Sequence, residues 1–302
     1  MQSALDQDIT AVATARWATA HDARLSELMQ ALVRHLHTFA REVRLTEPEW
    51  SAAMAWLART GQISDAKRAE FILASDVLGL SMLVVEMNHH HDPKATPATV
   101  LGPFHIEGSP PLDYGEDMAD GMSGVPLYVT GTVHDLHDEA VGGAVLDVWQ
   151  ADAEGIYEGQ LGEGDARLRA KYTSQPGGTY CVRTIAPLGY SIPMDGPVGE
   201  LISRTDISHY RPAHIHFLIT APGYEPLITH LFEKGAPYLD SDVVFGTKAD
   251  LVVEFEHRRP GPTPDGGTSD VPWLLAKYDF VLQPTRENND QVTTDEVKVI
   301  DR

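Results

Sequence analysis

Apolar residues recur at steps of three and four in the first third of the chain, which is the pattern of helices with one apolar face. Between residues 22 and 90 this pattern predicts three helices. The second should begin at Thr46, which forms a capping box with Glu49, and end at Gly61. The third should begin at Ser64 or Asp65. The apolar stripe of the first helix consists of Leu25, Leu28, Leu32, Leu36, Phe39 and Val43, and that of the third consists of Phe71, Val77, Leu78 and Val85.

Between residues 93 and 126 the composition shifts to Pro, Gly and Asp, which interrupt any periodic pattern. This segment is predicted to be a connection without secondary structure of its own. Long connections of this kind are often functional. We therefore expect its apolar residues Val100, Leu101 and Phe104 to line a pocket.

After residue 126 apolar and polar residues alternate with a period of two, in short runs separated by turn residues. The predicted strands are 127–133, 144–150, 179–185, 214–220, 227–232, 251–256 and 276–282. Several short strands of this kind are typical of a sandwich. The expected fold class is α+β, mainly β, with an antiparallel β-sandwich following a helical N-terminal region. The expected division is 1–92 helical, 93–126 connection, 127–285 sandwich and 286–302 polar tail.

Charge and composition narrow the range of partners. The chain has 302 residues with 23 basic and 44 acidic side chains, a net charge of −21. Such a field repels phosphate backbones and anionic lipid headgroups, so no nucleic-acid or membrane partner is expected. A single cysteine, Cys181, excludes an intrachain disulfide and fits a reducing compartment. With no signal-peptide pattern at the N-terminus and no apolar run of spanning length, the expected location is the cytoplasm.

The candidate chemistry begins with His214 and His216 in the apolar run RPAHIHF at 211–217. Residues two apart on a strand share a face, so both imidazoles should lie side by side, where they can bind a metal. Alone, the pair also suits two structural histidines. No Glu follows it at cupin spacing, and one cysteine cannot form a zinc thiolate site. Neither a Rossmann fingerprint nor a P-loop is present.

Two tyrosines provide further donors near predicted strand ends. Tyr157 lies in DAEGIYE at 152–158, and Tyr190 in APLGY at 186–190. Each alone suits an ordinary tyrosine with its hydroxyl in water. A phenol with a pKa near ~10 ionises only beside a strongly charged ion. Two tyrosines combined with two histidines therefore predict an Fe(III) site.

At this point the chain resembles the intradiol ring-cleavage dioxygenases. The resemblance covers roughly residues 20–285. Within the family, the chain is most similar to the hydroxyquinol-cleaving branch. The family motifs are VWQAD at 148–152, GIY at 155–157, GY at 189–190, RPAHIH at 211–216 and APGY at 221–224. The motifs of the branch are TVLGPFHIEG at 99–108, PMDGPVG at 193–199 and LDSDVVFG at 239–246.

The resemblance implies one Fe(III) per subunit, bound by Tyr157, Tyr190, His214 and His216. Tyr190 and His216 would be axial, and Tyr190 would be the ligand that the diol displaces, taking one of its protons. Arg211 would face the substrate ring and stabilise charge there. His230 stands where catechol-cleaving relatives have Gln. It either assists the later oxygen chemistry or packs beside the iron.

The resemblance also implies a substrate pocket. Its members are Leu73, Asp76, Val100, Leu101, Gly102, Pro103, Phe104, Ile192, Pro193, Arg211 and Val244. Asp76 is unusual because a carboxylate on an apolar face is costly without a partner. It would recognise a third ring hydroxyl, or it is an ordinary carboxylate on a helix surface. Leu101 stands where the branch can have an aromatic residue, so the preference for substituted rings should differ.

The implied reaction is intradiol cleavage of hydroxyquinol (benzene-1,2,4-triol) by O2, giving maleylacetate or 3-hydroxy-cis,cis-muconate in aromatic compound degradation. Cleavage of catechol or chlorocatechol is the alternative within the family. A non-catalytic transthyretin-like binding module is the alternative outside it. The resemblance also implies a homodimer through the N-terminal helices and leaves open whether a lipid lies between the subunits, although the apolar stripe at 25–43 equally suits packing within the subunit. The run His89-His90-His91 is interpreted as a solvated helix end.

Overall fold

The computed structural model describes residues 8–65, 68–89, 92–160 and 167–285. The chain falls into two units, residues 1–59 and 60–302. The first contains α1 and α2 and most of α3, and the second contains every other element. The helices are α1 (Ile9–Trp17), α2 (Ala23–Glu42), α3 (Glu47–Ile63), α4 (Glu70–Val77), α5 (Leu80–Asn88) and α6 (Pro197–Ile202).

In the first unit α1 and α2 pack together, although only α2 was predicted. Thr10 on α1 hydrogen-bonds His37 of α2 at 2.9 Å, and Arg41 Nη2 donates to Thr10 Oγ1 at 2.7 Å. The predicted stripe of α2 stays exposed, with 46–55% of each residue accessible. The capping box is confirmed, since Thr46 N donates to Glu49 Oε2 at 2.9 Å and Glu49 N to Thr46 Oγ1. The predicted end of this helix at Gly61 is wrong, because α3 continues to Ile63.

The third predicted helix is two helices. It does not begin at Ser64 or Asp65, because α4 starts at Glu70. Gly79 then separates α4 from α5, with a φ of 71° that L-residues rarely adopt. The expected stripe is also wrong: Phe71 and Leu78 are exposed, whereas the buried residues of the two helices are Glu70, Leu73, Ala74, Asp76 and Met82. Both helices are apolar on several sides, so periodicity alone does not determine which face is buried.

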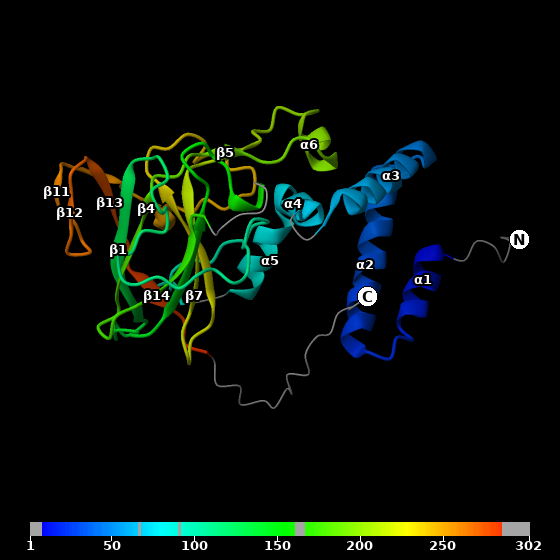
Figure 1. Ribbon diagram of the computed structural model, residues 1–302. Coiled ribbons are helices and arrows are strands. Elements are labelled where there is room, and N and C mark those ends of the chain that lie inside the picture. Colours follow the sequence, from blue (N-terminus) through cyan, green and yellow to red (C-terminus); the bar gives the residue numbers. More distant parts are fainter. Residues whose placement is uncertain (1–7, 66–67, 90–91, 161–166, 286–302) are drawn as a thin grey trace, which may run out of the picture. The chain divides into compact units, whose positions relative to one another are not determined.

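The second unit is dominated by two five-stranded sheets (Figure 1). One has the order β10-β13-β1-β14 with β4 also paired to β1, and the other has the order β3-β2-β7-β8-β9. Their strands are β1 (Pro126–Asp135), β2 (Val145–Gln150), β3 (Arg169–Thr173), β4 (Thr179–Ile185), β7 (His214–Thr220), β8 (Leu227–Glu233), β9 (Val252–Val253), β10 (Glu256–Arg258), β13 (Trp273–Lys277) and β14 (Phe280–Leu282). Short pairs are formed by β5 (Tyr190–Ser191) with β6 (Tyr210–Arg211) and by β11 (Gly261–Pro262) with β12 (Thr268–Ser269), and the 3-10 turns are η1 (Glu158–Gln160) and η2 (Ala249–Leu251).

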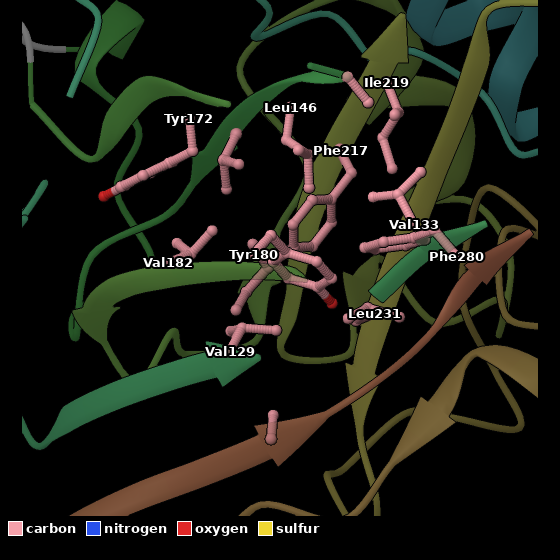
Figure 2. Packing of buried hydrophobic residues seen from close by; sticks show 14 of the residues in the cluster. Val129, Val133, Leu146, Tyr172, Tyr180, Val182, Phe217, Ile219, Leu231 and Phe280 are labelled. Carbon is pink, nitrogen blue, oxygen red and sulfur yellow. The ribbon is translucent and has the colours of Figure 1, made fainter. Parts of the chain in front are cut away.

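Side chains from both sheets form one hydrophobic core. Figure 2 shows Tyr180 of β4, Phe280 of β14 and Phe217 of β7 lying against one another. The Phe280 ring centroid is 5.4 Å from that of Tyr180 and 4.9 Å from that of Phe217. Phe217, with Ile215 and Ile219, faces this core, so the alternate residues of β7 face the opposite side of the sheet. The expected fold class, a mainly β chain with a sandwich, is confirmed.

Several strand predictions need correction. The expected strands 251–256 and 276–282 are each broken in two, and β3 was not predicted. The pairings β1–β13, β1–β14 and β8–β9 are parallel within an otherwise antiparallel arrangement. Between β13 and β14 the chain stays beside β1 in the same register. A Cβ at Gly131 would lie 1.7 Å from Tyr278 O, so glycine at this position allows the chain to approach β1 closely.

Within the described residues, none of the helices has the length and apolar content needed to span a bilayer. The connection at 92–126 contains only isolated bridges, such as Pro111 with Lys171 and Asp117 with Arg183. It therefore lies along the sheets as extended chain without regular elements. This agrees with the Pro- and Gly-rich composition of the segment.

Candidate metal centre and substrate cavity

Three neighbouring strands place the candidate metal-binding residues. In the register of β2, β7 and β8, Trp149 pairs with His216, and His216 pairs with His230. Directly paired residues on adjacent strands share a face of the sheet. Trp149 consequently stacks on His216 at 4.6 Å between ring centroids and 16° between planes. His214 lies two residues before His216 on the same face, away from the core that Ile215 and Phe217 enter.

Three donor atoms converge at this face. His214 Nε2 and His216 Nε2 lie 3.1 Å apart, and Tyr157 Oη lies 3.2 Å from the first and 3.0 Å from the second. Ligands of one metal ion, bound at about 2.0–2.2 Å, have mutual separations of this size. His214 Nδ1 must donate to Pro212 O, 2.7 Å away, because a carbonyl only accepts. This fixes the tautomer and leaves the Nε2 lone pair facing the other two donors.

Burial keeps both imidazoles neutral and therefore able to bind a metal. Desolvation, followed by the nearby charge of Arg211, lowers the pKa of His214 to about 3. Desolvation, with the neighbouring His230 and His214, lowers the pKa of His216 well below its ordinary value. His216 Nδ1 has no hydrogen-bond partner among the described residues. Neutral imidazoles are the form that metals bind.

The two tyrosines lie at the same place. The rings of Tyr157 and Tyr190 are 5.1 Å apart and nearly perpendicular, and Tyr190 is 5.7 Å from the His214 ring. Desolvation raises the pKa of both phenols, and for Tyr157 the neighbouring Tyr190 adds to this effect. Without a cation these buried hydroxyls would remain protonated. A strongly charged metal ion is the partner that makes buried phenolates reasonable, so the donor set fits such an ion.

Arg211 lies beside this group and is held by a carboxylate. Its Nε donates to Asp242 Oδ1 at 2.9 Å and its Nη2 to Asp242 Oδ2 at 3.2 Å, while Nη1 lies 3.2 Å from His214 Nε2. Both side chains are about 97% buried. Burial alone would raise the pKa of Asp242, but the Arg211 charge and hydrogen bonds lower it overall. The pair is therefore ionised, and Asp242 is further fixed by Gly246 N at 3.0 Å.

His230 is the third histidine of the cluster. His214, His216 and His230 each offer a ring nitrogen, and these nitrogens lie within 4.8 Å of one another. His230 Nδ1 is 2.6 Å from Thr99 Oγ1, which holds the ring, and Nε2 has no partner among the described residues. The triangle that includes Tyr157 is tighter than the group of three histidines. His230 thus stands beside that triangle with a free nitrogen.

A narrow cavity adjoins these residues. Its lining is Leu73, Asp76, Val100, Gly102, Pro103, Phe104, Tyr190, Ile192, Pro193, Arg211 and Val244. Every residue expected in the substrate pocket is present except Leu101, which lines an adjoining open hollow with residues of α4 and α5. Phe104 stacks on Tyr157 with centroids 4.5 Å apart. The cavity therefore adjoins the candidate metal centre directly.

Asp76 is the one acidic residue in the lining of this cavity. It is 1% exposed, and neither carboxylate oxygen has a partner at ordinary hydrogen-bond distance among the described residues, although the Ser81 hydroxyl lies close enough to lower the pKa in part. Desolvation raises its pKa. The interpretation of Asp76 as a carboxylate on a helix surface is wrong, because the side chain is buried at the cavity. A buried polar group without a partner is costly, so it calls for a ligand or a functional reason.

Comparisons with known proteins agree with this arrangement. The family model for "Dioxygenase" matches residues 100–284, and that for "Catechol dioxygenase N terminus" matches residues 22–96. The chain belongs to the intradiol dioxygenase family. It is an intradiol dioxygenase by sequence as well as by fold. A hydroxyquinol 1,2-dioxygenase of Nocardioides simplex is 45% identical, over 94% of this chain and 97% of the relative.

Further relatives extend the comparison. A 6-chlorohydroxyquinol 1,2-dioxygenase of Cupriavidus pinatubonensis is 46% identical over 94% of this chain and 100% of its own length. The crystal structure of a hydroxyquinol 1,2-dioxygenase from Pseudomonas putida DLL-E4 superimposes with a TM-score of 0.84, at 45% identity, over 92% of this chain and 98% of the other. That of a catechol 1,2-dioxygenase from Pseudomonas arvilla C-1 gives 0.81 at 25% identity, over 95% and 94%.

Sequence reasoning missed three residues that hold the site of this intradiol dioxygenase: Trp149, Thr99 and Asp242. Trp149 stacks on His216, Thr99 holds His230, and Asp242 anchors Arg211. All three lie in motifs that carried the family resemblance, yet none is distinguished there by residue type. The register of β2 with β7 was the available signal for Trp149. Of the run at 89–91, His90 and His91 lie outside the described residues.

Proposed function

We propose that this intradiol dioxygenase cleaves hydroxyquinol at an Fe(III) centre held by Tyr157, Tyr190, His214 and His216. The observation that carries the proposal is the triangle of Tyr157 Oη, His214 Nε2 and His216 Nε2, with sides of 3.0–3.2 Å, beside a narrow cavity that Tyr190 and Arg211 also line. Two phenols favour a hard trivalent ion over zinc. When bound, the iron would hold the diol and make it reactive toward O2.

The protein groups would handle charge and protons. Tyr190 Oη would accept one proton of the incoming diol when its place beside the metal is taken. Arg211, kept cationic by Asp242, lies against His214 and lines the cavity, so its charge would stabilise negative charge that develops on the ring. His230 would keep Nε2 free beside His214 and His216 while Thr99 holds Nδ1. We propose that His230 assists the later oxygen chemistry without binding the metal.

Asp76 supports hydroxyquinol over catechol. Its carboxylate lines the cavity without a partner, so a substrate with a third hydroxyl can satisfy it by donating a hydrogen bond, whereas catechol cannot. A site built to bind a hydroxyl rejects the analogue that lacks it, because the buried polar group is then left unpaired. The hydroxyquinol-cleaving relatives are consistent with this preference. The product would be 3-hydroxy-cis,cis-muconate, or maleylacetate as its tautomer.

We propose three further properties of the chain. The exposed stripe of α2 supports a homodimer formed through the N-terminal helices of residues 1–92, with a lipid able to occupy so apolar a surface. The sandwich at 127–285 and the connection at 93–126 would make the catalytic part, followed by a tail at 286–302. The single buried cysteine supports a cytoplasmic location.

Metal analysis and oxygen uptake test the proposed function together. We expect freshly purified protein to be wine-red, to contain one iron per chain, and to consume O2 faster with hydroxyquinol than with catechol. Zinc or no metal would contradict the iron site. Faster cleavage of catechol or chlorocatechol would instead show that one of these diols is the preferred substrate. A colourless protein with no uptake on any diol would favour a binding module.

A further inference from the structure

The PMDGPVG segment at 193–199 contributes Pro193 to the cavity, but most of it lies outside the site. Its Asp195 forms a double contact with Arg68, which precedes α4: Arg68 Nη1 donates to Asp195 Oδ2 at 3.0 Å and Nη2 to Oδ1 at 2.8 Å. Parallel bonds of this kind fix the relative orientation of two groups as well as attracting them. The segment is thus joined to the start of α4.

Glu70 makes the connection a closed network. Its Oε2 accepts from Arg68 Nε at 3.0 Å, and its Oε1 accepts from Val198 N, in the first turn of α6, at 3.1 Å. The Glu70 side chain is fully buried. Arg68, Glu70 and Asp195, which we call the clamp, therefore bind α4 to the 193–198 segment by three hydrogen bonds, and the fourth joins Arg68 to Glu70.

The clamp requires glycine at position 196 because the clamp side chains leave no room for a Cβ there. Its φ of −118° and ψ of −179° suit any residue, so the backbone does not require glycine. A Cβ at this position would lie 2.4 Å from Glu70 Oε1 and 2.5 Å from Arg68 Nη2. A methyl group here would push the two clamp side chains apart while leaving the local backbone conformation acceptable.

The clamp joins the two walls of the substrate cavity. Leu73 and Asp76 come from α4, three and six residues after Glu70, whereas Ile192 and Pro193 come from the segment that leads to Asp195. A wider hollow of about 450 Å³ lies beside the cavity, shares Leu73, Pro103, Phe104 and Pro193 with it, and is also lined by the clamp. The distance between the two walls therefore depends on the contacts of the clamp, which lies in this wider hollow.

We propose that the Arg68–Glu70–Asp195 clamp sets the spacing of these two walls and so determines which ring size the cavity admits. The inference rests on the proposed function, since the rings are catechols and hydroxyquinol. Its members are positioning residues, because none of them lines the inner cavity. With the clamp intact, a small trihydroxybenzene fits against Asp76. With the clamp released, α4 is free to move outward, and catechols with bulky ring substituents gain relative to hydroxyquinol.

The test compares substrate preference in clamp variants of the iron-loaded protein. For Arg68→Met, Asp195→Asn and Gly196→Ala, we expect kcat/KM for hydroxyquinol relative to 4-tert-butylcatechol to fall about tenfold. One methylene group more or less in an apolar pocket changes the ratio of two kcat/KM values by about 10–200-fold. The change should lie in KM and in anaerobic binding of each diol. The double variant of Arg68→Met with Asp195→Asn should shift the preference no further than Arg68→Met alone. Arg68→Met already removes the contact between Arg68 and Asp195.

Controls separate the clamp from general damage. Lys234→Met removes an exposed ion pair with Glu254 in the same unit and should leave the preference unchanged. The iron colour should stay near wild type in the clamp variants. The thermal midpoint should stay near wild type for Asp195→Asn, whose carboxylate is exposed, but should fall for Arg68→Met, which leaves the buried Glu70 without its counter-charge. A parallel loss on both substrates, or an unchanged ratio, would overturn the clamp. If wild-type protein fails to cleave hydroxyquinol, the proposed function fails instead, while the ratio between two catechols still tests the clamp.

Discussion

The two sides of the cavity are built by different means. The metal side consists of residues on β2, β7 and β8, whose positions follow from strand register and whose donor atoms lie 3.0–3.2 Å apart. The opposite side consists of α4 and two irregular segments, where side-chain contacts such as those of the clamp join the elements. The register of paired strands determines where each side chain lies. The position of a wall made of helix and loop depends instead on individual side-chain contacts.

This difference suggests a division of roles. The strand side is suited to chemistry that every substrate shares, because a metal site requires ligands at fixed separations. The helix and loop side is suited to selecting the substrate, because its spacing can change without disturbing the sheet. Substitutions on the two sides should therefore have different signatures: loss of metal and all turnover on the first, and altered preference or stability on the second.

The largest effect is expected for the strand side. His216→Ala and Tyr157→Phe each remove a corner of the donor triangle, so both should lose iron colour and lower kcat by roughly 10³-fold or more, as for other groups that act as a unit. Iron content and oxygen uptake measure this. His257→Ala, an exposed strand histidine on β10, is the matched control and should change neither. Full activity in either of the first two variants would contradict the metal site.

An intermediate effect is expected where the two sides meet, at Asp242. Asp242→Asn leaves the Arg211 charge buried without its counter-charge, which costs about 3 kcal/mol in comparable pairs. The thermal midpoint should fall, and kcat should fall more than iron content, because Arg211 would lose its fixed position beside His214. Glu254→Gln, which breaks an exposed pair, should change stability by less than about 1 kcal/mol. Equal stability losses in the two variants would contradict the anchoring role.

The same division explains how much the sequence predicts. Alternation in 214–220 and 227–232 places His214, His216 and His230 on strands, because a period of two determines which side chains share a face. It does not place Tyr157 and Tyr190, which were proposed from their positions near predicted strand ends and then matched by the family resemblance, nor Asp242, whose pairing with Arg211 joins residues 31 apart in the chain. The faces of α4 and α5 were predicted wrongly, since helices apolar on several sides give no clear periodicity.

The smallest effect is expected at Asp76, on the helix side. Burial raises its pKa, so the folded protein binds this proton more tightly than the unfolded chain does. Stability should therefore fall as the pH rises from the unfolded value near about 4 through the raised folded pKa, and remain lower above it. The charges that bear on Asp76 are those of Arg211, which lowers its pKa, and Asp242, which raises it. Neither offsets desolvation, the largest cause.

Asp76→Asn removes this ionisation, so at neutral pH the variant should be more stable than wild type by on the order of 1 kcal/mol. The advantage should disappear below about pH 4, where both states of the wild-type carboxyl are protonated. Denaturant unfolding across that pH range measures it. The same variant should also prefer hydroxyquinol over catechol less strongly. In the wild type the third ring hydroxyl gives the buried carboxylate a hydrogen-bond partner, and catechol has no such hydroxyl. A variant that gains no stability at neutral pH, or keeps the full preference, would show that Asp76 is not held for recognition.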